Sequence, residues 1–404
     1  MREPLRKLAA VATCGAVLVS LAYGAFALAQ VAAFGRRPVH EPFGTAGDGR
    51  DAKALPDPFL SVLKPLRGAE PRLAELLTSF CAQGFDRFEV IFGARDPDDP
   101  ALAVARDVAA RFPLIARVVT ADATTPRHAN PKIDTLAALV PHARGDVLVI
   151  SDADMRVDRA YLRAVAAPFA DGRTGAVTCL YRGAAAVDDL ASQLGAQGNH
   201  EHFAPSALVA SALLPQRFCF GATMAVRRDV FEAFGGLAAL GSHLADDARL
   251  GALVAILGHE VVLARYVVEN AVAEDGLGGL WRHELRWART HRTLEPGGYA
   301  GLLLTYPIAL ALVHLPFARR RGRALALLGL ALASRLALSV AARRAFGVTS
   351  PWRPWLVPLR DALGCAVWVA SFFGRGVRWR DDSFEVARDG RLVPRAPRAP
   401  DART

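Results

Sequence analysis

The sequence predicts an α/β fold with a mostly parallel central sheet, one N-terminal membrane helix and two to three C-terminal membrane helices. Three observations support this prediction. Between residues 59 and 270, apolar segments of strand length alternate with segments of helical periodicity. Acidic residues follow directly where two of these strands are expected to end. Long apolar segments lie near both ends of the chain, which has 404 residues, 52% of them hydrophobic.

The first apolar segment, residues 8–34, is uncharged. Its length of about 27 residues is enough to cross a hydrocarbon core of about 30 Å. A secretory signal peptide is the alternative, because the small residues Ala25, Ala27 and Ala29 could suit a signal peptidase. The segment is longer than the usual apolar part of a signal peptide. We therefore expect an uncleaved transmembrane anchor at 1–35, followed by a linker at 36–58.

The alternating region, assigned as one domain at 59–298, contains four predicted strands and three predicted helices. The strands are expected at 59–66, 88–96, 114–122 and 146–154, and the helices at 71–83, 100–112 and 132–143. Such β-α-β units imply a parallel sheet covered by helices on both faces. Open sheets of this kind bind ligands beyond the carboxyl ends of their strands. Asp96, Asp152 and Asp154 are therefore expected at a ligand-binding edge.

Three further apolar segments, at 299–318, 324–342 and 355–373, define a C-terminal membrane region at 299–375. Charged residues interrupt the second and third segments, so not every segment has to be a straight span that faces lipid. These residues are Arg335, Arg360 and Asp361. The remainder, 376–404, is expected to be a basic cytoplasmic tail with a small hairpin around an Asp-Gly pair.

Charge and cysteine content exclude two classes of function. The net charge is +10, but basic residues cluster beside the apolar segments, in RRPVH, RRRGR and RGVRWR. Such flanks are typical of cytoplasmic membrane boundaries, and there is no zinc-finger spacing or RNA-binding motif, so nucleic acid is excluded as a partner. The five cysteines form no C-x-x-C pair, which argues against a disulfide framework or a zinc site.

Asp152 and Asp154 form a D-x-D pair in VLVISDADMRV. A polar loop or a helix cap is the plain alternative, since Ser and Asp favour both. The chemistry that needs two acids at a strand end is the binding of a divalent cation with a diphosphate. Mg²⁺ or Mn²⁺ takes a few carboxylate oxygens and leaves positions for water and phosphate.

The wider arrangement is more specific than this pair. Asp246 and Asp247 precede a helical pattern, and Arg282, Arg286 and Trp287, in the six-residue stretch RHELRW, stand just before the first C-terminal apolar segment. The order D, D-x-D, D-D and a final R-W pair resembles the processive-type inverting glycosyltransferases, family 2 in the broad sense, over residues 59–290. The last motif of that family is (Q/R)-x-x-R-W, and Arg282 stands one residue further from Arg286 than this spacing. The resemblance implies a GT-A-type nucleotide-sugar-binding domain, a UDP-sugar donor, a divalent metal and inversion at the sugar.

The resemblance assigns roles to the acids. Asp96 matches the acid that binds the base or ribose, although a turn residue beside Pro97 is the alternative. Asp152 matches the acid near the diphosphate, and Asp154 is the metal ligand, with Asp152 as a second candidate ligand. Asp247 matches the general base, while Asp246 is interpreted as a helix cap or a supporting group.

The same resemblance assigns the basic and aromatic residues to the donor site. Arg282 and Arg286 supply fixed donors for diphosphate oxygens, and Trp287 offers a flat face to a sugar or a lipid acceptor. Lys132 is a candidate for neutralising phosphate, with an ordinary surface lysine as the alternative. The expected reaction is a single displacement with one base. A glycosidase would instead need two carboxylates flanking the bond that breaks.

Longer phrases are similar to the ceramide glucosyltransferase branch, namely SVLKPLRGAEPRL, VIFGARDPDDPAL, HANPKIDTL and SDADMRV. More narrowly, they are similar to bacterial hopanoid-biosynthesis-associated glycosyltransferases, which transfer N-acetylglucosamine to a polyhydroxylated hopanoid tail. Animal ceramide glucosyltransferases keep only the first acid of the D-x-D pair, so the intact pair favours a lipid other than ceramide. Ceramide or another glycolipid remains the alternative acceptor.

These resemblances imply a multi-pass protein of the bacterial inner membrane with a cytoplasmic catalytic domain. RRPVH after the first span agrees with this orientation, and two full later spans would also place the basic tail in the cytoplasm. RRRGR would be cytoplasmic only if 299–318 is re-entrant or interfacial. Two rival functions are a non-catalytic membrane subunit and a processive polysaccharide synthase. A non-catalytic membrane subunit would have lost acids, and none is lost, whereas a processive polysaccharide synthase needs more membrane helices than this chain offers.

Overall fold

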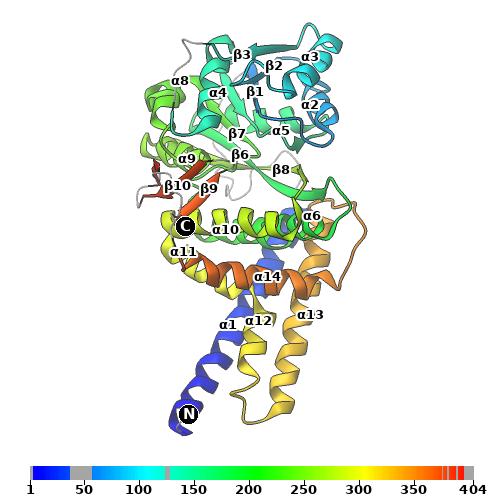
Figure 1. Ribbon diagram of the computed structural model, residues 1–404, viewed down its shortest axis with the longest axis vertical. Helices are drawn as coiled ribbons and strands as arrows, with labels where there is room; N and C mark the ends of the chain where they lie inside the picture. Colours follow the sequence, from blue (N-terminus) through cyan, green and yellow to red (C-terminus); the bar gives the residue numbers. More distant parts are fainter. Residues whose placement is uncertain are drawn as a thin grey trace, which may run out of the picture. The chain divides into compact units, whose positions relative to one another are not determined.

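The computed structural model describes residues 3–36, 57–122, 128–374, 376–379, 382–387 and 390–394 (Figure 1). The chain divides into two compact units, which are described separately. The sheet unit comprises Ala29–Ala273 with Ala341–Ser350. The helical unit comprises Met1–Leu28, Glu274–Val340 and Pro351–Thr404, so the predicted domain boundary at 298 falls inside it.

An eight-stranded sheet with the order β3-β2-β1-β4-β7-β6-β8-β5 forms the centre of the sheet unit. Its strands are β1 (Leu60–Leu66), β2 (Phe88–Ala94), β3 (Ala116–Thr120), β4 (Val147–Ile150), β5 (Met155–Arg156), β6 (Thr174–Ala185), β7 (Met224–Arg227) and β8 (Glu260–Val272). The neighbours β3-β2, β2-β1, β1-β4 and β6-β8 are parallel, while β7 and β5 pair antiparallel with their neighbours. The predicted mostly parallel sheet and the four predicted strands, β1 to β4, are confirmed.

Helices cover both faces of this sheet, because the strands are apolar on both sides. The α-helices of the unit are α2 (Leu73–Cys81), α3 (Ala101–Arg111), α4 (Pro131–Leu139), α5 (Tyr161–Ala166), α6 (Leu190–Gly198), α7 (Ala204–Leu213), α8 (Arg228–Ala233) and α9 (Asp246–Ile256). Four shorter turns are η1 (Val140–His142), η2 (Ala167–Ala170), η4 (Gly236–Ala239) and the π-helical η3 (Asn199–Phe203). Val62 packs with α2, α3 and α5 on one face, and its neighbour Leu63 packs with α4, α8 and α9 on the other. This alternation follows from the period of two in a strand.

The helical unit contains the apolar segments. Its helices are α1 (Glu3–Arg36, up to Leu28), α10 (Gly276–Leu294), α11 (Pro296–Gly301), η5 (Leu302–Thr305), α12 (Pro307–His314), α13 (Arg321–Ala345, up to Val340) and α14 (Leu356–Ser371). Among the described residues, α1 and α13 are long and apolar enough to cross a membrane. This confirms the N-terminal apolar helix and one C-terminal apolar helix. The strands β9 (Gly376–Trp379), β10 (Asp382–Val386) and β11 (Leu392–Pro394) form a small antiparallel sheet, as the predicted hairpin requires.

The other two apolar segments differ from simple spans. The first bends by 72° between Pro296–Thr305 and Pro307–His314, so that the two parts make at most one broken span or a re-entrant loop. Pro307 begins α12, where a proline costs nothing because the first helical N–H groups have no partner in the helix. The third segment forms α14, which has 16 residues and lies beside α10 within the helical unit (Figure 1).

The charges that interrupt these segments are buried in ion pairs. Arg335 Nε lies 3.0 Å from Asp361 Oδ1, and Asp361 Oδ2 accepts a hydrogen bond of 3.2 Å from the N–H of Ile308. Arg360 forms a two-pronged pair with Glu284 of α10, with Nη2 and Oε2 2.9 Å apart. Each buried charge thus has a partner of opposite sign, as charged groups removed from water require.

The C-terminal ends of α1 and α13 belong to the sheet unit. The rings of Phe34 and Phe346 meet edge to face, with their centroids 5.7 Å apart. The guanidinium of Arg265 lies 5.1 Å from the centre of the Phe34 ring, and Arg182 of β6 donates a hydrogen bond of 2.7 Å to the carbonyl of Phe346. Residues from three distant parts of the sequence therefore stabilise this corner of the unit.

Candidate functional site

Three segments meet beyond the carboxyl end of β4. The strand ends at Ile150, and Asp152 follows it in the loop. The ammonium of Lys132, in the first turn of α4, lies 2.7 Å from Asp152 Oδ1 and 3.1 Å from Asp246 Oδ2 at the start of α9. The N-cap Asn130 and Pro131 at the first helical position fix the start of α4 and so the place of Lys132. The predicted site residues Lys132, Asp152 and Asp247, which follows Asp246, are therefore brought together.

Gly221 connects the two acidic segments through its backbone. Its N–H donates to Asp247 Oδ2 at 3.1 Å, and its carbonyl accepts from the N–H of Asp152 at 3.3 Å. A Cβ at this position would lie 2.6 Å from Asp152 Oδ2, closer than atoms in contact allow. A side chain at this position would therefore displace the Asp152 carboxylate, so the glycine allows the present placement of that carboxylate beside Lys132.

Asp154 has one bound and one free oxygen. Its Oδ2 accepts a hydrogen bond of 2.7 Å from Asn270 Nδ2, while Oδ1 is buried without a hydrogen-bond partner among the described residues. A buried acceptor of this kind calls for an explanation, and a cation that binds there is one. No group of three or more His, Cys, Asp or Glu side chains in the described part of the chain could hold a metal ion by itself. A cation at Asp154 and Asp152 would therefore complete its ligands with phosphate and water, as Mg²⁺ commonly does.

A second lysine, not predicted from the sequence, contacts the start of the loop that carries the D-x-D pair. Lys64 of β1 is fully buried, and its ammonium lies 3.8 Å from the centre of the Phe80 ring. It donates to the backbone carbonyl of Asp152 and, at 3.4 Å, to the hydroxyl of Ser151. Lys64 thus positions the loop through its backbone. The available signal was a lysine within the otherwise apolar strand LSVLKPL.

Burial and mutual repulsion shift the pKa values of these groups. Burial raises the pKa of Asp154 to about 7, and it raises that of Asp247 to about 6, with Asp246 adding to the shift. Burial lowers the pKa of Lys64 to about 7. Burial also acts to lower the pKa of Lys132, but Asp152 and Asp246 outweigh it and raise that pKa. Perturbed pKa values in one cluster are typical of functional sites.

Asp96 lies at the same edge of the sheet, two strands from the cluster. It follows β2, and β1 separates β2 from β4. Its side chain is exposed, and Oδ1 accepts a hydrogen bond of 3.0 Å from the N–H of Asp98. No contact between Asp96 and Asp152 is found in the described residues, so the turn interpretation and the ligand-binding interpretation both stay open.

Arg282, Arg286 and Trp287 lie on α10 in the helical unit and are described within that unit alone. Trp287 is 43% exposed, and its ring centroid lies 4.3 Å from that of His283. His283 Nδ1 is 2.8 Å from Glu274 Oε1, while Arg282 is exposed and 3.9 Å from Asp275. Arg286 lies one turn beyond Arg282 on the same helix. The donor-site role of these residues stays a prediction.

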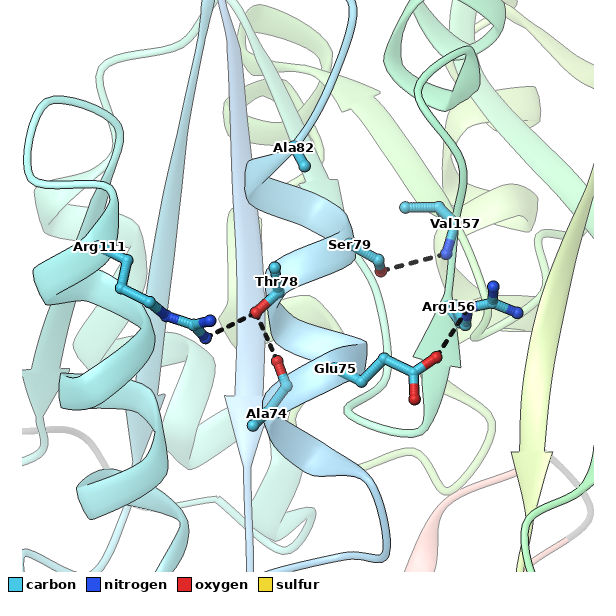
Figure 2. Close-up of a pocket in the computed structure, with 8 residues that line it drawn as sticks. All are labelled: Ala74, Glu75, Thr78, Ser79, Ala82, Arg111, Arg156 and Val157. Carbon is cyan, nitrogen blue, oxygen red and sulfur yellow. Dashed lines mark hydrogen bonds and ion pairs between the residues drawn. The ribbon is translucent and has the colours of Figure 1, made fainter.

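A pocket of about 400 Å³ lies elsewhere on the sheet unit, against α2 (Figure 2). Arg111 and Arg156 border it, and Arg111 donates a hydrogen bond of 2.8 Å to the hydroxyl of Thr78. None of the predicted site residues lines this pocket. We therefore assign the functional site to the acidic cluster, because the predicted metal ligands and the predicted base lie there and not in the pocket.

Part of this chain is similar in sequence to known proteins. A ceramide glucosyltransferase of Komagataella phaffii is 30% identical over 112 residues, which cover 26% of this chain and 22% of that protein. A ceramide glucosyltransferase of Candida albicans is 27% identical over 107 residues, covering 24% of this chain and 20% of that protein. The chain thus aligns with only about a fifth of the length of these curated relatives.

The fold and the family match extend over most of the chain. A mannosyltransferase from Pyrobaculum calidifontis, solved in complex with GDP-Man and Mn²⁺, is similar with a TM-score of 0.51 and 20% identity, covering 91% of this chain and 99% of that chain. The fold is accordingly α/β and GT-A-like. The family model of glycosyl transferase family 21 matches residues 12–392. The chain therefore belongs to glycosyl transferase family 21, and part of it is similar to ceramide glucosyltransferases.

Proposed function

We propose that this glycosyltransferase is an inverting, metal-dependent membrane enzyme that transfers N-acetylglucosamine from its UDP-sugar to a hydroxyl of a hopanoid-type polyol lipid. The observation that carries the proposal is the cluster of Asp152, Asp154, Asp247 and Lys132 beyond β4. It combines an acidic oxygen for a cation, a lysine for phosphate and a half-buried acid for proton transfer. These are the groups that transfer from a nucleotide sugar requires.

The donor diphosphate is assigned to the D-x-D pair and the basic residues. Asp154, with Asp152 as second ligand, would hold Mg²⁺ or Mn²⁺, which neutralises charge that develops on the departing diphosphate. Lys132 already faces Asp152 and is placed to bind a phosphate oxygen beside it. We assign Arg282 and Arg286 to the diphosphate, Trp287 to the sugar, and Asp96 to the base or ribose, as the family resemblance implies.

Asp247 is the proposed general base. Burial raises its pKa to about 6, so the group is ionised at pH 7 and yet binds a proton more tightly than an ordinary aspartate. The N–H of Gly221 holds Oδ2 at 3.1 Å, which orients the carboxylate. Asp247 takes the proton from the lipid hydroxyl while that oxygen attacks the anomeric carbon. The bond to the diphosphate breaks on the opposite side, which inverts an α-linked donor to a β product and releases UDP.

Two acceptors remain candidates. The hopanoid polyol is favoured by the phrases LKPLRGAEP, ARDPDDP and SDADMRV, and by the intact acid pair Asp152 and Asp154. Ceramide with a glucose donor is the second candidate, because the curated relatives that the chain matches are ceramide glucosyltransferases. A lipid acceptor agrees with α1 and α13, which are long and apolar enough to cross a membrane. We place the enzyme in the bacterial inner membrane with its sheet unit in the cytoplasm, where nucleotide sugars are found.

The test is an acceptor and donor matrix with the purified full-length protein in detergent. Hopanoid polyol, ceramide and diacylglycerol are each incubated with UDP-N-acetylglucosamine or UDP-glucose, and products are identified by mass spectrometry and NMR. We expect a β-linked N-acetylglucosaminyl hopanoid. Transfer to ceramide but not to the hopanoid would replace the first candidate by the second. An α-linked product would contradict inversion.

A further inference from the structure

Two buried asparagines lead from η3 to Asp154. Asn199 Nδ2 donates a hydrogen bond of 2.9 Å to Asn270 Oδ1, and Asn270 Nδ2 donates one of 2.7 Å to Asp154 Oδ2. Asn199 is 4% exposed and Asn270 8%. Neither residue belongs to the motifs assigned above, and neither has a part in the proposed chemistry. The question is what two buried, hydrogen-bonded amides do beside Asp154.

The direction of this chain of hydrogen bonds follows from the chemistry of its groups. In the cation-binding form Asp154 is an ionised carboxylate, which only accepts, so it faces the NH₂ of Asn270. The carbonyl of Asn270 then faces Asn199, which must present its own NH₂. The orientation of both amides is thus fixed by the carboxylate at one end. Asn199 holds the Asn270 amide in this orientation by donating to its carbonyl oxygen.

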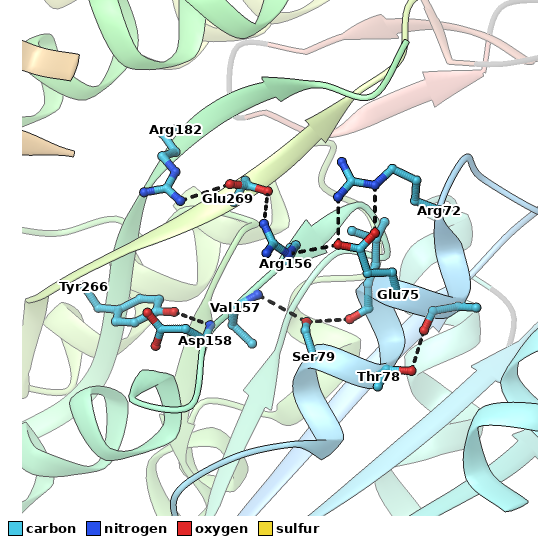
Figure 3. A network of polar contacts seen from close by, with 12 residues as sticks. Arg72, Glu75, Thr78, Ser79, Arg156, Val157, Asp158, Arg182, Tyr266 and Glu269 are labelled. Atoms are coloured by element: carbon cyan, nitrogen blue, oxygen red, sulfur yellow. Dashed lines mark hydrogen bonds and ion pairs between the residues drawn. The ribbon is translucent and has the colours of Figure 1, made fainter. Parts of the chain in front are cut away.

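Strand pairing brings Asn270 to Asp154 and holds it there. In the antiparallel pair β5-β8, Met155 is opposite Asn270, and the N–H of Ala271 donates to the carbonyl of Asp154 at 2.8 Å. At the next position, Arg156 and Glu269 form an ion pair of 2.7 Å, and Arg182 adds a second partner to Glu269 at 3.0 Å (Figure 3). These contacts hold the β5-β8 backbone in place. The two amides are therefore not needed for strand pairing, and their hydrogen bonds orient the Asp154 side chain.

A neutral amide serves a cation ligand better than a basic residue would. It fixes Oδ2 by one hydrogen bond and leaves the negative charge of the carboxylate in place. The other oxygen, Oδ1, is the buried atom without a hydrogen-bond partner among the described residues. Groups that orient a metal ligand from behind typically change metal affinity by about 10- to 100-fold when they are replaced.

We infer that Asn270 and Asn199 are positioning residues that direct the free oxygen of Asp154 toward a divalent cation. This inference rests on the proposed function, in which Asp154 is a metal ligand. Asn270 acts on Asp154 directly, and Asn199 acts through Asn270. The two asparagines therefore set the affinity of the site for the cation.

The inference is tested by Mn²⁺ binding to the full-length protein in detergent, without donor or acceptor, with free Mn²⁺ measured by electron paramagnetic resonance. Asn270→Ala removes the hydrogen bond to Asp154, and we expect about 10- to 100-fold weaker binding. Asn199→Asp cannot donate to Asn270, so the amide loses its orientation, and binding should weaken in the same range. Asn199→Ala removes the donor without adding a charge and should weaken binding by a smaller factor. The Mn²⁺ concentration for half-maximal transfer should rise in parallel.

The matched control is Glu269→Gln, a carboxylate-to-amide change at the neighbouring position of the same strand pair. It breaks the ion pairs with Arg156 and Arg182 and leaves the two asparagines intact. Its Mn²⁺ affinity should stay within about twofold of the unmodified protein, well below the range expected for a lost orienting group. Equal weakening by Glu269→Gln and Asn270→Ala would mean general loosening of β5-β8 and would overturn the inference. Melting temperatures identify any variant that fails to fold.

Asp154→Ala separates failure of this inference from failure of the proposed function. If Asp154→Ala binds Mn²⁺ as the unmodified protein does, Asp154 is no metal ligand and both proposals are overturned. If Asp154→Ala loses Mn²⁺ while the Asn199 and Asn270 variants bind it normally, only the positioning role is overturned. Loss in Asp154→Ala together with weakening in the asparagine variants supports both.

Discussion

The two units bury charged side chains in opposite ways. In the helical unit, Arg335 pairs with Asp361 and Arg360 with Glu284, so each of these buried charges has a partner of opposite sign. In the sheet unit, the carboxylates of Asp152, Asp154, Asp246 and Asp247 gather around the ammonium groups of Lys64 and Lys132. Matched pairs hold structure, because loss of either partner leaves a buried charge. An unmatched cluster keeps negative charge available for a ligand, which is the property of a functional site.

The sharpest test of this contrast is removal of divalent metal. We expect EDTA to abolish sugar transfer by the purified protein, and Mg²⁺ or Mn²⁺ to restore it, because the proposed cation ligands Asp152 and Asp154 belong to the sheet-unit cluster. The melting temperature in the same detergent should change little, since the pairs of the helical unit need no cation. Initial rates with and without chelator measure the first effect, and a metal-saturated EDTA sample is the control. Full activity in EDTA would contradict the assigned role of Asp152 and Asp154.

The converse change targets a matched pair. Asp361→Asn leaves Arg335 buried without its counter-charge, and we expect the free energy of unfolding to fall by about 3–5 kcal/mol. Thermal melting in detergent measures the loss. The double variant Arg335→Leu with Asp361→Leu removes both charges and should recover much of the stability. A single variant as stable as the unmodified protein would show that this pair holds no structure.

We expect the next largest effect, a loss of turnover, when the proposed base Asp247 is replaced. Asp247→Asn keeps the shape of the side chain but cannot take a proton, and we expect turnover to fall at least about 100-fold. Donor binding, measured by calorimetry, should be close to normal, as should the melting temperature. Turnover near that of the unmodified enzyme would remove Asp247 from the role of general base.

The smallest expected effect is a shift in pH dependence. Because the pKa of Asp247 is raised to about 6, kcat/KM should fall with acidity below that pH, as the base becomes protonated. Asp246 adds to this shift, so Asp246→Asn should move the fall to lower pH. A raised pKa also means that the folded protein binds this proton more tightly than the unfolded chain. The contribution of Asp247 to stability is therefore largest in acid and is lost as pH rises through about 6. An unmoved profile in Asp246→Asn would show that the fall belongs to another group.

The parts of the fold that were predictable rest on local patterns. Strands β1 to β4 and helices α2 to α4 follow from apolar periodicity along consecutive residues. The pairing of β5 with β8 joins residues 155 and 270, and no local pattern encodes such a contact. The bend before α12 had a local signal, the proline in TYPIAL. The length and hydropathy of the whole segment, which are typical of a straight span, pointed the other way.

The residues of the site also fall into those that local sequence patterns predict and those that they do not. Asp152, Asp154 and Asp247 stand in short motifs, and the order of these motifs along the chain was informative. Gly221 and Asn270 act through a backbone approach and a cross-strand contact, which become visible only after folding. Sequence motifs therefore predict the residues proposed to contact the ligand. They do not predict the residues that position those side chains.

The corner formed by Phe34, Phe346 and Arg182 has a practical consequence for biochemistry. A water-soluble fragment cut to residues 57–273 would lack both aromatic rings and the carbonyl that Arg182 binds. Arg265 would lose the ring that it covers, and an apolar surface now shielded by two helix ends would face water. Such a fragment should aggregate or melt early. Preparations for kinetics and calorimetry are therefore best made from the intact chain in detergent micelles or nanodiscs, with both apolar helices retained.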